Sequence, residues 1–269
     1  MKPLIHFAHA NGVPSKVYQK FFDALSDQFD VIYTTNLGVD QRYPVDQHWE
    51  SMTQQVIDNI VQKSHGRKVI GIGHSLGGVL TFKAALKCPE LFSQTILLDP
   101  PLIMGLESFA MHIAKSLKLK AVDQMSPAAL SKRRRDHWDS REQAATLLRP
   151  KALYAAFDEQ CFNDYIQFAL VEDPKRGGVE LAIPKSIEVD IFRTNPSLWW
   201  LPQPKLKVPS QLIVASEGPF LARKFPHKVR KKFGVPFSIF EGGHMFPLEH
   251  PEQLAAHLKT ILTPLKNAA

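Results

Sequence analysis

The chain has 269 residues, of which 44% are hydrophobic and 22% charged, with a formal net charge of +7. These ordinary values indicate a soluble globular protein of one domain with an insertion, or of two domains. No apolar run approaches the roughly 18 residues of a membrane-spanning helix, and the two cysteines lack metal-ligand spacing. We therefore expect no membrane span, no metal and no disulfide framework, in a reducing, cytoplasmic setting.

Short β-rich runs alternate with helical runs, which is typical of an α/β protein with a mainly parallel sheet. The N-terminal apolar run is too short for a signal peptide and is predicted to form the first strand. The strands are predicted at residues 3–8, 30–35, 67–73, 94–99, 211–215 and 236–240. The main helices are predicted at residues 15–29, 46–64 and 247–263.

This alternation stops after about a hundred residues and resumes near residue 206. Between these points the pattern is helical and irregular, so a helical insertion is the simplest account. We predict a core domain made of residues 1–100 and 206–269, with a helical lid formed by residues 101–205.

A Gly-x-Ser-x-Gly sequence runs from Gly73 to Gly77, with Ser75 at its centre. It follows a β-branched run and precedes a helical one, the context in which this motif indicates a nucleophilic serine. A serine hydroxyl needs to be held exposed beside a base, and glycines leave room for the sharp turn that does so. An ordinary glycine-rich turn is the alternative, against which the rest of the chain argues.

His244 is the best candidate for the base. It lies just past the last predicted strand, in the sequence Glu241-Gly242-Gly243-His244, whose glycines loosen the loop. Ligands of α/β sheets gather at the carboxyl ends of the strands, and a late histidine after the serine fits the hydrolase chain order.

Two residues compete for the acid that would orient His244. Asp99 ends a predicted strand, and Glu217 follows a later one. Either carboxylate would fix the imidazole tautomer and stabilise its cation. Because residues 214–220 contain no aspartate, we favour Asp99, whose alternative role is to cap the loop that begins at Pro100.

An oxyanion site needs two N–H donors. The first is expected from the backbone of Leu76, directly after Ser75, where the start of a helix leaves its N–H groups free. The second is expected from the loop after the first strand, residues 9–14, with Val13 as its donor. The alternative is that Asn11-Gly12 is merely a turn.

Taken in order, these motifs resemble those of an α/β-hydrolase-fold serine hydrolase over residues 3–100 and 206–265. The motifs that carry the resemblance are His9–Pro14, Gly73–Gly78 and Gly242–His244 followed by Pro247-Leu248-Glu249. The resemblance implies Ser75 as nucleophile, His244 as base, and Val13 and Leu76 as oxyanion donors. In one departure, Ser216-Glu217-Gly218-Pro219 replaces the family's Gly-x-x-Asp acid segment.

Aromatic residues are frequent in the predicted lid, where most are expected to pack the lid onto the core. Three of them are candidates for the substrate pocket: Trp138, Trp199 and Trp200. A lid over the serine has to bury an apolar underside, which such rings would provide.

The net charge is concentrated in one segment without acids, between Glu217 and Glu241. It holds six basic residues: Arg223, Lys224, Lys228, Arg230, Lys231 and Lys232. A patch of this kind could steer anionic substrates or contact nucleic acid. Because no nucleic-acid motif accompanies it, we interpret it as a solvated helix face and expect a small-molecule substrate.

The predicted function is hydrolysis of a small or medium carboxylic ester through an acyl-enzyme, without a cofactor. Thioester, lactone and C–C bond hydrolysis are alternatives, because the fold hosts all of them. A noncatalytic ligand-binding protein with a weakened triad is a further alternative, supported by the departure in the acid segment. The sequence does not predict the oligomeric state.

Overall fold

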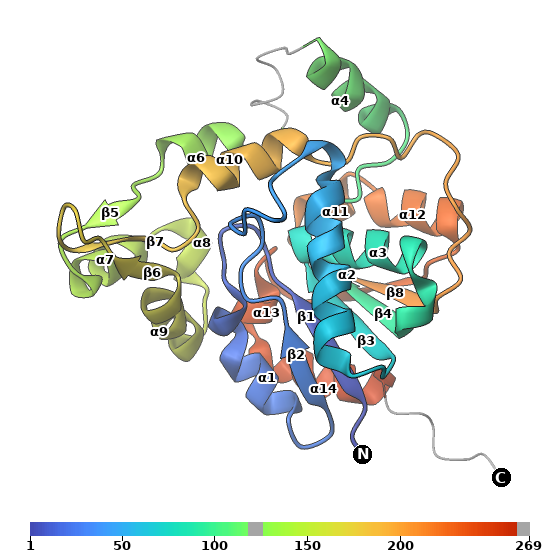
Figure 1. Ribbon diagram of the computed structural model, residues 1–269, viewed down its shortest axis with the longest axis horizontal. Helices are drawn as coiled ribbons and strands as arrows, with labels where there is room; N and C mark the ends of the chain where they lie inside the picture. The colour runs from blue at the N-terminus through green and yellow to red at the C-terminus, as the bar shows by residue number, and fades with distance from the viewer. Residues whose placement is uncertain (118–125, 263–269) are drawn as a thin grey trace.

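Six parallel strands form the central sheet of the computed structural model, which describes residues 1–117 and 126–262 (Figure 1). Their order across the sheet is β2-β1-β3-β4-β8-β9. Neighbouring strands pair in parallel throughout. The strands are β1 (Leu4–Ala8), β2 (Asp30–Tyr33), β3 (Val69–His74), β4 (Phe92–Leu98), β8 (Ser210–Ala215) and β9 (Phe237–Phe240).

The innermost strands are buried along their length because helices cover both faces of the sheet. Every residue of β1 and β3 is buried, which is typical of parallel sheets enclosed on both sides. All six predicted strands are present, with ends that differ by a few residues, and the prediction of a mainly parallel α/β sheet is confirmed.

Two layers of helices sandwich the sheet. One face is covered by α1 (Gln19–Leu25) and α14 (Pro251–Leu262), which pack against each other. The other face is covered by α2 (Glu50–Ser64), α3 (Leu76–Lys87) and α12 (Phe225–Phe233). Shorter helical turns complete the core: η1 (Ser15–Tyr18), η2 (Gln47–Trp49), η3 (Pro89–Leu91), α11 (Pro219–Ala222) and α13 (Phe246–Glu249).

The predicted helix 247–263 is interrupted between α13 and α14. Pro251 begins α14, and the residue before it, His250, has a φ of −134° and a ψ of 55°. A proline disfavours helical backbone at the preceding residue, which explains the break.

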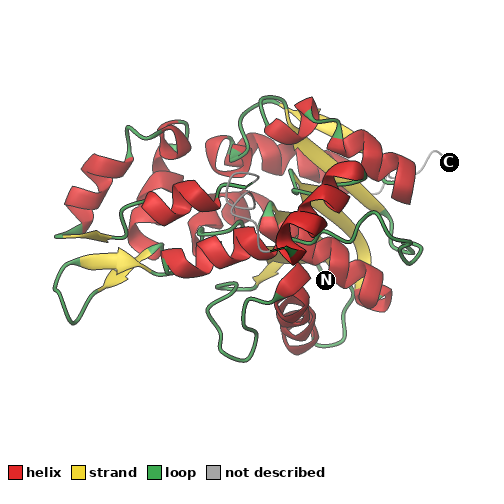
Figure 2. Cartoon of the chain, turned by 90° about the horizontal axis from the view of Figure 1, so that it is seen from above, coloured by secondary structure: helices red, strands yellow, loops and turns green. Residues whose placement is uncertain are grey.

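Residues 101–205, here named the inserted segment, connect β4 to β8. Their helices are α4 (Leu106–Ser116), α6 (Ala128–Arg133), α7 (Arg141–Leu148), α8 (Ala152–Ala155), α9 (Glu159–Phe168) and α10 (Lys185–Thr194). The segment also contains a three-stranded antiparallel sheet of β5 (His137–Trp138), β7 (Val179–Leu181) and β6 (Leu170–Glu172). The small sheet and the central sheet lie at opposite ends of the molecule (Figure 2).

The segment predicted as helical and irregular thus contains a small antiparallel sheet besides its helices. Between β6 and β7 the chain reverses at Gly177 and Gly178, which have φ values of 73° and 74°. Glycine adopts this left-handed backbone without a steric penalty, so the pair permits the chain to reverse between β6 and β7.

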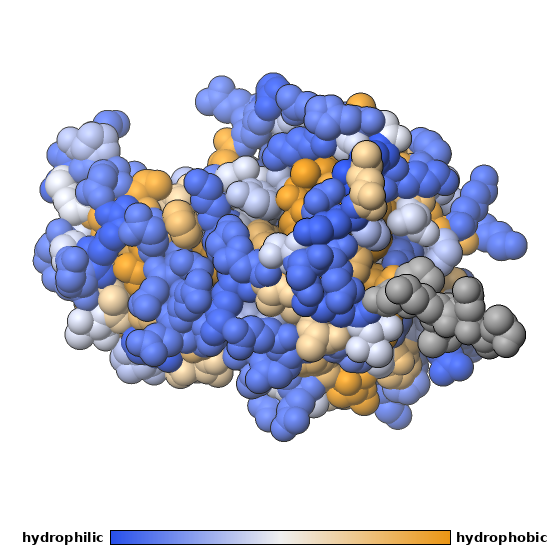
Figure 3. Space-filling view, turned by 90° about the horizontal axis from the view of Figure 1, so that it is seen from below, coloured by the Kyte–Doolittle hydropathy of each residue, from blue (hydrophilic) through white to orange (hydrophobic). Residues whose placement is uncertain are grey.

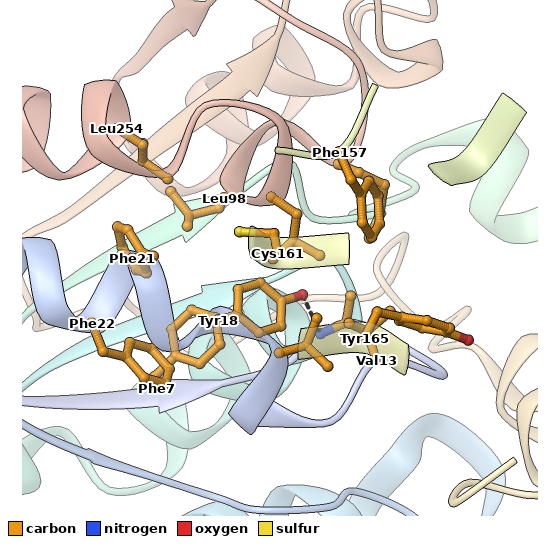
Figure 4. Close-up of a cluster of buried hydrophobic side chains, with 14 of the residues drawn as sticks. Phe7, Val13, Tyr18, Phe21, Phe22, Leu98, Phe157, Cys161, Tyr165 and Leu254 are labelled. Carbon is orange, nitrogen blue, oxygen red and sulfur yellow. Dashed lines mark hydrogen bonds between the residues drawn. The ribbon is translucent and has the colours of Figure 1, made fainter. Parts of the chain in front are cut away.

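The inserted segment shares its apolar core with the central domain. In Figure 4, Cys161 and Tyr165 of α9 lie in the same buried cluster as Val13, Tyr18 and Phe7. Helix α9 packs against η1, α1 and α13. This continuity fixes one end of the inserted segment to the loop that follows β1.

Within the described residues, no helix is both long and apolar enough to cross a membrane. The face seen from below is mostly hydrophilic, with hydrophobic groups interspersed (Figure 3). Part of the basic segment is engaged within the molecule: Arg223 and Lys228 both pair with Glu107 of α4. Lys232 donates to the carbonyl oxygen of Leu201 at 2.7 Å.

Three fully buried histidines give the fold an expected sensitivity to acid. Burial lowers the pKa values of His6, His9 and His74 from 6.5 to about 3, 4 and 3. Below pH 6.5 the unfolded chain binds protons at these rings that the folded chain does not bind. Their stabilisation is therefore complete above pH 6.5 and is lost as the pH falls toward about 3, the folded-state value of His6 and His74.

We predict that the free energy of unfolding falls by about 1.4 kcal/mol per pH unit for each of these histidines below pH 6.5. Urea denaturation at about pH 7 and about pH 5.5 measures this decrease, above the range in which most carboxylates titrate. Because the pKa of His48 is also lowered by burial, to about 4, four histidines contribute, and the variant His6→Asn should show a slope shallower by roughly one quarter. Equal free energies at the two pH values would contradict this account.

Candidate active site

Ser75 lies at the sharp turn between β3 and α3, with φ 53° and ψ −115°. Glycines make the turn possible. A Cβ on Gly73 would lie 2.2 Å from the carbonyl oxygen of Gly77, and a Cβ on Gly77 would lie 2.0 Å from that of Ala8. The strained backbone therefore holds the hydroxyl at the carboxyl edge of the sheet, and any larger residue at these glycines would move it.

The imidazole of His244 links this hydroxyl to a buried carboxylate. His244 Nε2 lies 3.0 Å from Ser75 Oγ, and His244 Nδ1 lies 2.6 Å from Asp99 Oδ2. Both distances are within hydrogen-bond range. The structure thus brings together three side chains that the sequence places at the ends of β3 and β4 and after β9.

Asp99, rather than Glu217, is the carboxylate at the imidazole. Its side chain is fully buried, and its second oxygen, Oδ1, accepts a hydrogen bond from the Ala215 N–H at 3.2 Å. The Asp99 carboxylate accepts the hydrogen bond from the N–H at His244 Nδ1. The other ring nitrogen, Nε2, is then unprotonated and faces Ser75. Glu217 is exposed, and its backbone N–H donates to Gly242 at 3.1 Å.

The loop that carries His244 is fixed on both sides. Gly243 N–H donates to Glu249 Oε2 at 2.8 Å, and Gly242 N–H donates to Ser216 Oγ at 3.1 Å. The glycine-rich segment is consequently a positioned loop rather than a loose one. Phe220 covers the imidazole with an edge-to-face contact, at 5.5 Å between ring centroids.

A second histidine, His74, supports the backbone of His244. His74 Nε2 lies 2.9 Å from the carbonyl oxygen of His244, and His74 Nδ1 lies 2.8 Å from Tyr18 Oη. Because burial lowers the pKa of His74 to about 3, the ring is neutral and carries one N–H. That N–H is on Nε2 and donates to His244, while Nδ1 accepts from the Tyr18 hydroxyl.

Sequence reasoning missed His74 and Tyr18. The available signal was a polar, titratable side chain inside the Gly73–Gly77 motif, where a buried residue needs a partner. The Tyr18 oxygen also accepts the Ala10 N–H at 3.3 Å, shown as a dashed line in Figure 4. This chain of hydrogen bonds connects the loop after β1 with the His244 loop.

The loop after β1 does not present Val13 as an oxyanion donor. The Val13 N–H donates to the Ala10 carbonyl oxygen at 3.1 Å, closing a turn whose third residue, Gly12, has a φ of 74°. The expectation for Val13 is corrected, because a donor used inside its own turn is not free. Across the described ranges 1–117 and 126–262, no acceptor is found for the N–H groups of Asn11 and Leu76.

The three tryptophans proposed for a substrate pocket lie in different surroundings. Trp138 is fully buried in one core cluster, and Trp199 is 5% exposed in the other, beside Phe82. Trp200 is 40% exposed and packs edge-to-face on Phe109. Because large apolar rings gain most from burial, Trp138 and Trp199 are packing residues here, and the three do not form one pocket wall.

Among the described residues, no group of three histidine, cysteine or acidic side chains is arranged to hold a metal ion. The site consists of a hydroxyl, an imidazole, a carboxylate and free backbone N–H groups. This set can transfer protons and stabilise an oxyanion at a carbonyl carbon.

Comparison with known proteins identifies the chain. The model of the "Alpha/beta hydrolase family" matches residues 7–257. A type I acyl-CoA thioesterase from Penicillium brevicompactum is 26% identical over 170 residues, which span 58% of this chain and 37% of that protein. An abhydrolase domain-containing protein, AFT2-1, from Alternaria alternata is 30% identical over 108 residues, spanning 39% of this chain and 34% of that protein. The chain thus covers little more than a third of the length of these relatives.

Two solved structures share the fold over nearly the whole chain. The first is E-2-(acetamidomethylene)succinate hydrolase, with a TM-score of 0.74 and 17% identity, covering 97% of this chain and 92% of that one. The second is a thioesterase domain from the curacin biosynthetic pathway, with a TM-score of 0.71, 16% identity and the same coverage. At these identities the likeness concerns the fold.

We predict that Tyr18→Phe slows the reaction of Ser75 with a fluorophosphonate probe roughly tenfold, since a small misplacement of the base is costly. Removing the hydroxyl leaves a buried ring nitrogen of His74 without a donor and loosens the support of His244. Tyr43→Phe is the matched control, because the Tyr43 hydroxyl donates to Asp58 at 2.7 Å, outside this network. Equal labelling rates for both variants would show that the network does not position His244.

Proposed function

Because this chain belongs to the alpha/beta hydrolase family, we propose that it is a serine hydrolase that cleaves a small or medium carboxylic ester through an acyl-enzyme. The observation that carries the proposal is the continuous hydrogen-bonded chain from Ser75 through His244 to Asp99. In it Ser75 is the nucleophile, His244 the general base and Asp99 the acid that orients the imidazole.

In the first half of the reaction, the Ser75 oxygen attacks the carbonyl carbon of the ester. Its proton passes to His244 Nε2, and Asp99 stabilises the imidazolium that forms. When the tetrahedral intermediate collapses, His244 returns the proton to the leaving alcohol. The acyl group is then bound to Ser75 as an ester.

In the second half, water replaces the alcohol. His244 takes a proton from the water, which attacks the acyl carbon, and the collapse of the second intermediate returns the proton to Ser75. The products are the carboxylic acid and the free enzyme. The same base serves both halves because Asp99 holds it in one tautomer.

The negative oxygen of each intermediate needs two donors. We assign the first to the Leu76 N–H, at the start of α3, where the helix dipole adds a favourable field. The second we assign to the Asn11 N–H, because the neighbouring Val13 N–H is already bonded to Ala10. This assignment replaces Val13 with Asn11 in the proposed oxyanion site.

An acyl thioester is the second candidate substrate. It is favoured by the Penicillium relative, whose name is type I acyl-CoA thioesterase and which matches 58% of this chain. The same residues can cleave an oxygen ester or a thioester, because in both the serine attacks a carbonyl carbon and an oxyanion forms on the carbonyl oxygen. Comparing kcat/KM for an oxygen ester and a thioester of one acyl chain decides between them.

We also propose that residues 101–205 act as a lid over Ser75, with residues 1–100 and 206–269 as the catalytic core. Phe220 of α11 and Met111 of α4 belong to one small apolar cluster with Ile103 and Phe225. Since Phe220 contacts His244, this cluster extends from the inserted segment to the imidazole. It supports an apolar environment for the acyl group.

The noncatalytic alternative depended on a missing acid. The contact between Asp99 and His244 removes the reason for expecting a weakened triad. The replacement of the usual acid segment by residues 216–219 then has a simple explanation, because the carboxylate comes from the end of β4 instead.

We predict that Ser75→Ala lowers the hydrolysis of both test substrates by ~10³-fold or more, because the nucleophile is lost. Labelling by a fluorophosphonate should disappear, while the melting temperature changes little. Ser93→Ala, at an exposed serine on β4, is the matched control and should keep full activity. Unchanged turnover in Ser75→Ala would exclude Ser75 from the mechanism.

We predict that Asp99→Asn lowers kcat by several orders of magnitude, since an amide at this position favours the wrong tautomer of His244. Glu217→Gln should lower it by less than about tenfold, because this side chain is exposed and outside the hydrogen-bonded chain. Steady-state kinetics on the two purified variants make the comparison. The opposite ranking would assign the acid role to Glu217.

A further inference from the structure

A buried ion pair of the inserted segment lies directly over the loop that follows β1. Arg134, at the end of α6, donates from Nη1 to Glu188 Oε1 at 2.7 Å and to Oε2 at 2.9 Å. Glu188, on α10, is only 3% exposed. The Glu188 carboxylate is so close to Gly12 that a Cβ there would lie 2.6 Å from its Oε1.

The guanidinium of Arg134 is held from its other side by two tyrosines. Its Nη2 donates to Tyr154 Oη at 3.1 Å and to Tyr165 Oη at 3.0 Å, and these two hydroxyls lie 3.1 Å apart. Four contacts to one planar group leave it little freedom. The position of the Glu188 carboxylate is therefore determined by α6, α8 and α9 as well as by its own helix.

This pair is costly to bury. Burial raises the pKa of Glu188, and the charge of Arg134 only partly opposes that rise. A buried ion pair can often be replaced by apolar residues without loss of stability, so stability alone does not account for it. A geometric role explains why the charges lie against a loop rather than in the apolar core.

Hydrogen bonds hold several groups of the loop under the pair. The His9 ring donates from Nδ1 to the Ala10 carbonyl oxygen at 2.7 Å and accepts the Leu37 N–H at 2.8 Å. The side chain of Asn11 donates from Nδ2 to the Glu188 carbonyl oxygen at 3.1 Å. Glu188 thus contacts the loop twice, through its backbone at Asn11 and through its carboxylate at Gly12.

We propose that Glu188 and Arg134 are positioning residues that hold the Asn11 N–H in the oxyanion site. The inserted segment then completes the catalytic site, in addition to covering it. Glu188 fixes the turn from outside; among the described residues the N–H groups of Asn11 and Gly12 have no acceptor, and that of Asn11 is the one assigned to the oxyanion. This inference rests on the proposed function, because it assigns the support of an oxyanion donor.

The test compares Glu188→Gln with Glu172→Gln. The first variant keeps the shape of the side chain but removes the charge that binds Arg134. The second is the matched control, because Glu172 pairs with Arg141 on the exposed side of the same inserted segment. We expect Glu188→Gln to lower kcat about 10- to 100-fold, which does not exceed the decrease in kcat on removing an oxyanion donor completely. KM should change by less than about twofold.

A transition-state analogue separates a positioning role from a general loss of folding. A trifluoromethyl ketone that forms a tetrahedral adduct with Ser75 should bind Glu188→Gln more weakly, by the same factor as kcat/KM. The variant Arg134→Lys keeps the charge but loses the planar fork, and should show the same pattern. Because it leaves Glu188 intact, it also provides a second test if Glu188→Gln does not fold.

The outcomes distinguish this inference from the proposed function. If Ser75→Ala remains active, the proposed function fails and the inference with it. If Ser75→Ala is inactive while Glu188→Gln and Arg134→Lys keep the kcat and inhibitor affinity of the parent enzyme, only the inference is overturned. It is also overturned if Glu172→Gln reduces kcat as much as Glu188→Gln does.

Discussion

The short hydrogen bond between Asp99 and His244 is the contact on which the proposed chemistry depends. At 2.6 Å it joins the end of β4 to the loop after β9, two segments that are 145 residues apart. The contact requires that β8 lie between these strands with its neighbours in parallel register. The register of the sheet therefore sets the distance between the two groups, since a shift of β8 along its neighbours would separate the carboxylate from the imidazole.

Neutral, buried side chains surround Asp99 and His244 and hold the two residues in place. His74 and Tyr18 support the backbone of His244, while the ring of His9 fixes the loop after β1. Burial keeps both additional histidines uncharged, so His244 is the imidazole beside Ser75 that is free to accept a proton. The expected consequence is a fold that loses stability in mild acid, as a result of the same burial that orders the site.

Sequence patterns predicted the parts of this protein that depend on local order. Alternating apolar runs located all six strands, and the turn glycines located Ser75, because both properties are encoded within a few neighbouring residues. The preference for Asp99 rested on its place at a strand end and on the absence of an aspartate from residues 214–220. The small sheet of the inserted segment and the contact of Glu188 with Gly12 were not predictable, since they join residues far apart in the chain. Val13 was assigned as a donor from its place in the loop after β1, with a turn at Asn11-Gly12 as the alternative, and its N–H is bonded inside that turn.

The central claim is that an acyl group passes through Ser75, and trapping that intermediate tests it most directly. The enzyme is mixed with an activated ester, quenched in acid within the first turnover, digested and examined by mass spectrometry. The account predicts one added acyl mass on the peptide that contains Ser75, appearing together with a burst of released alcohol. An enzyme that turns over without any acylated peptide, or with the acyl group on another residue, would contradict it.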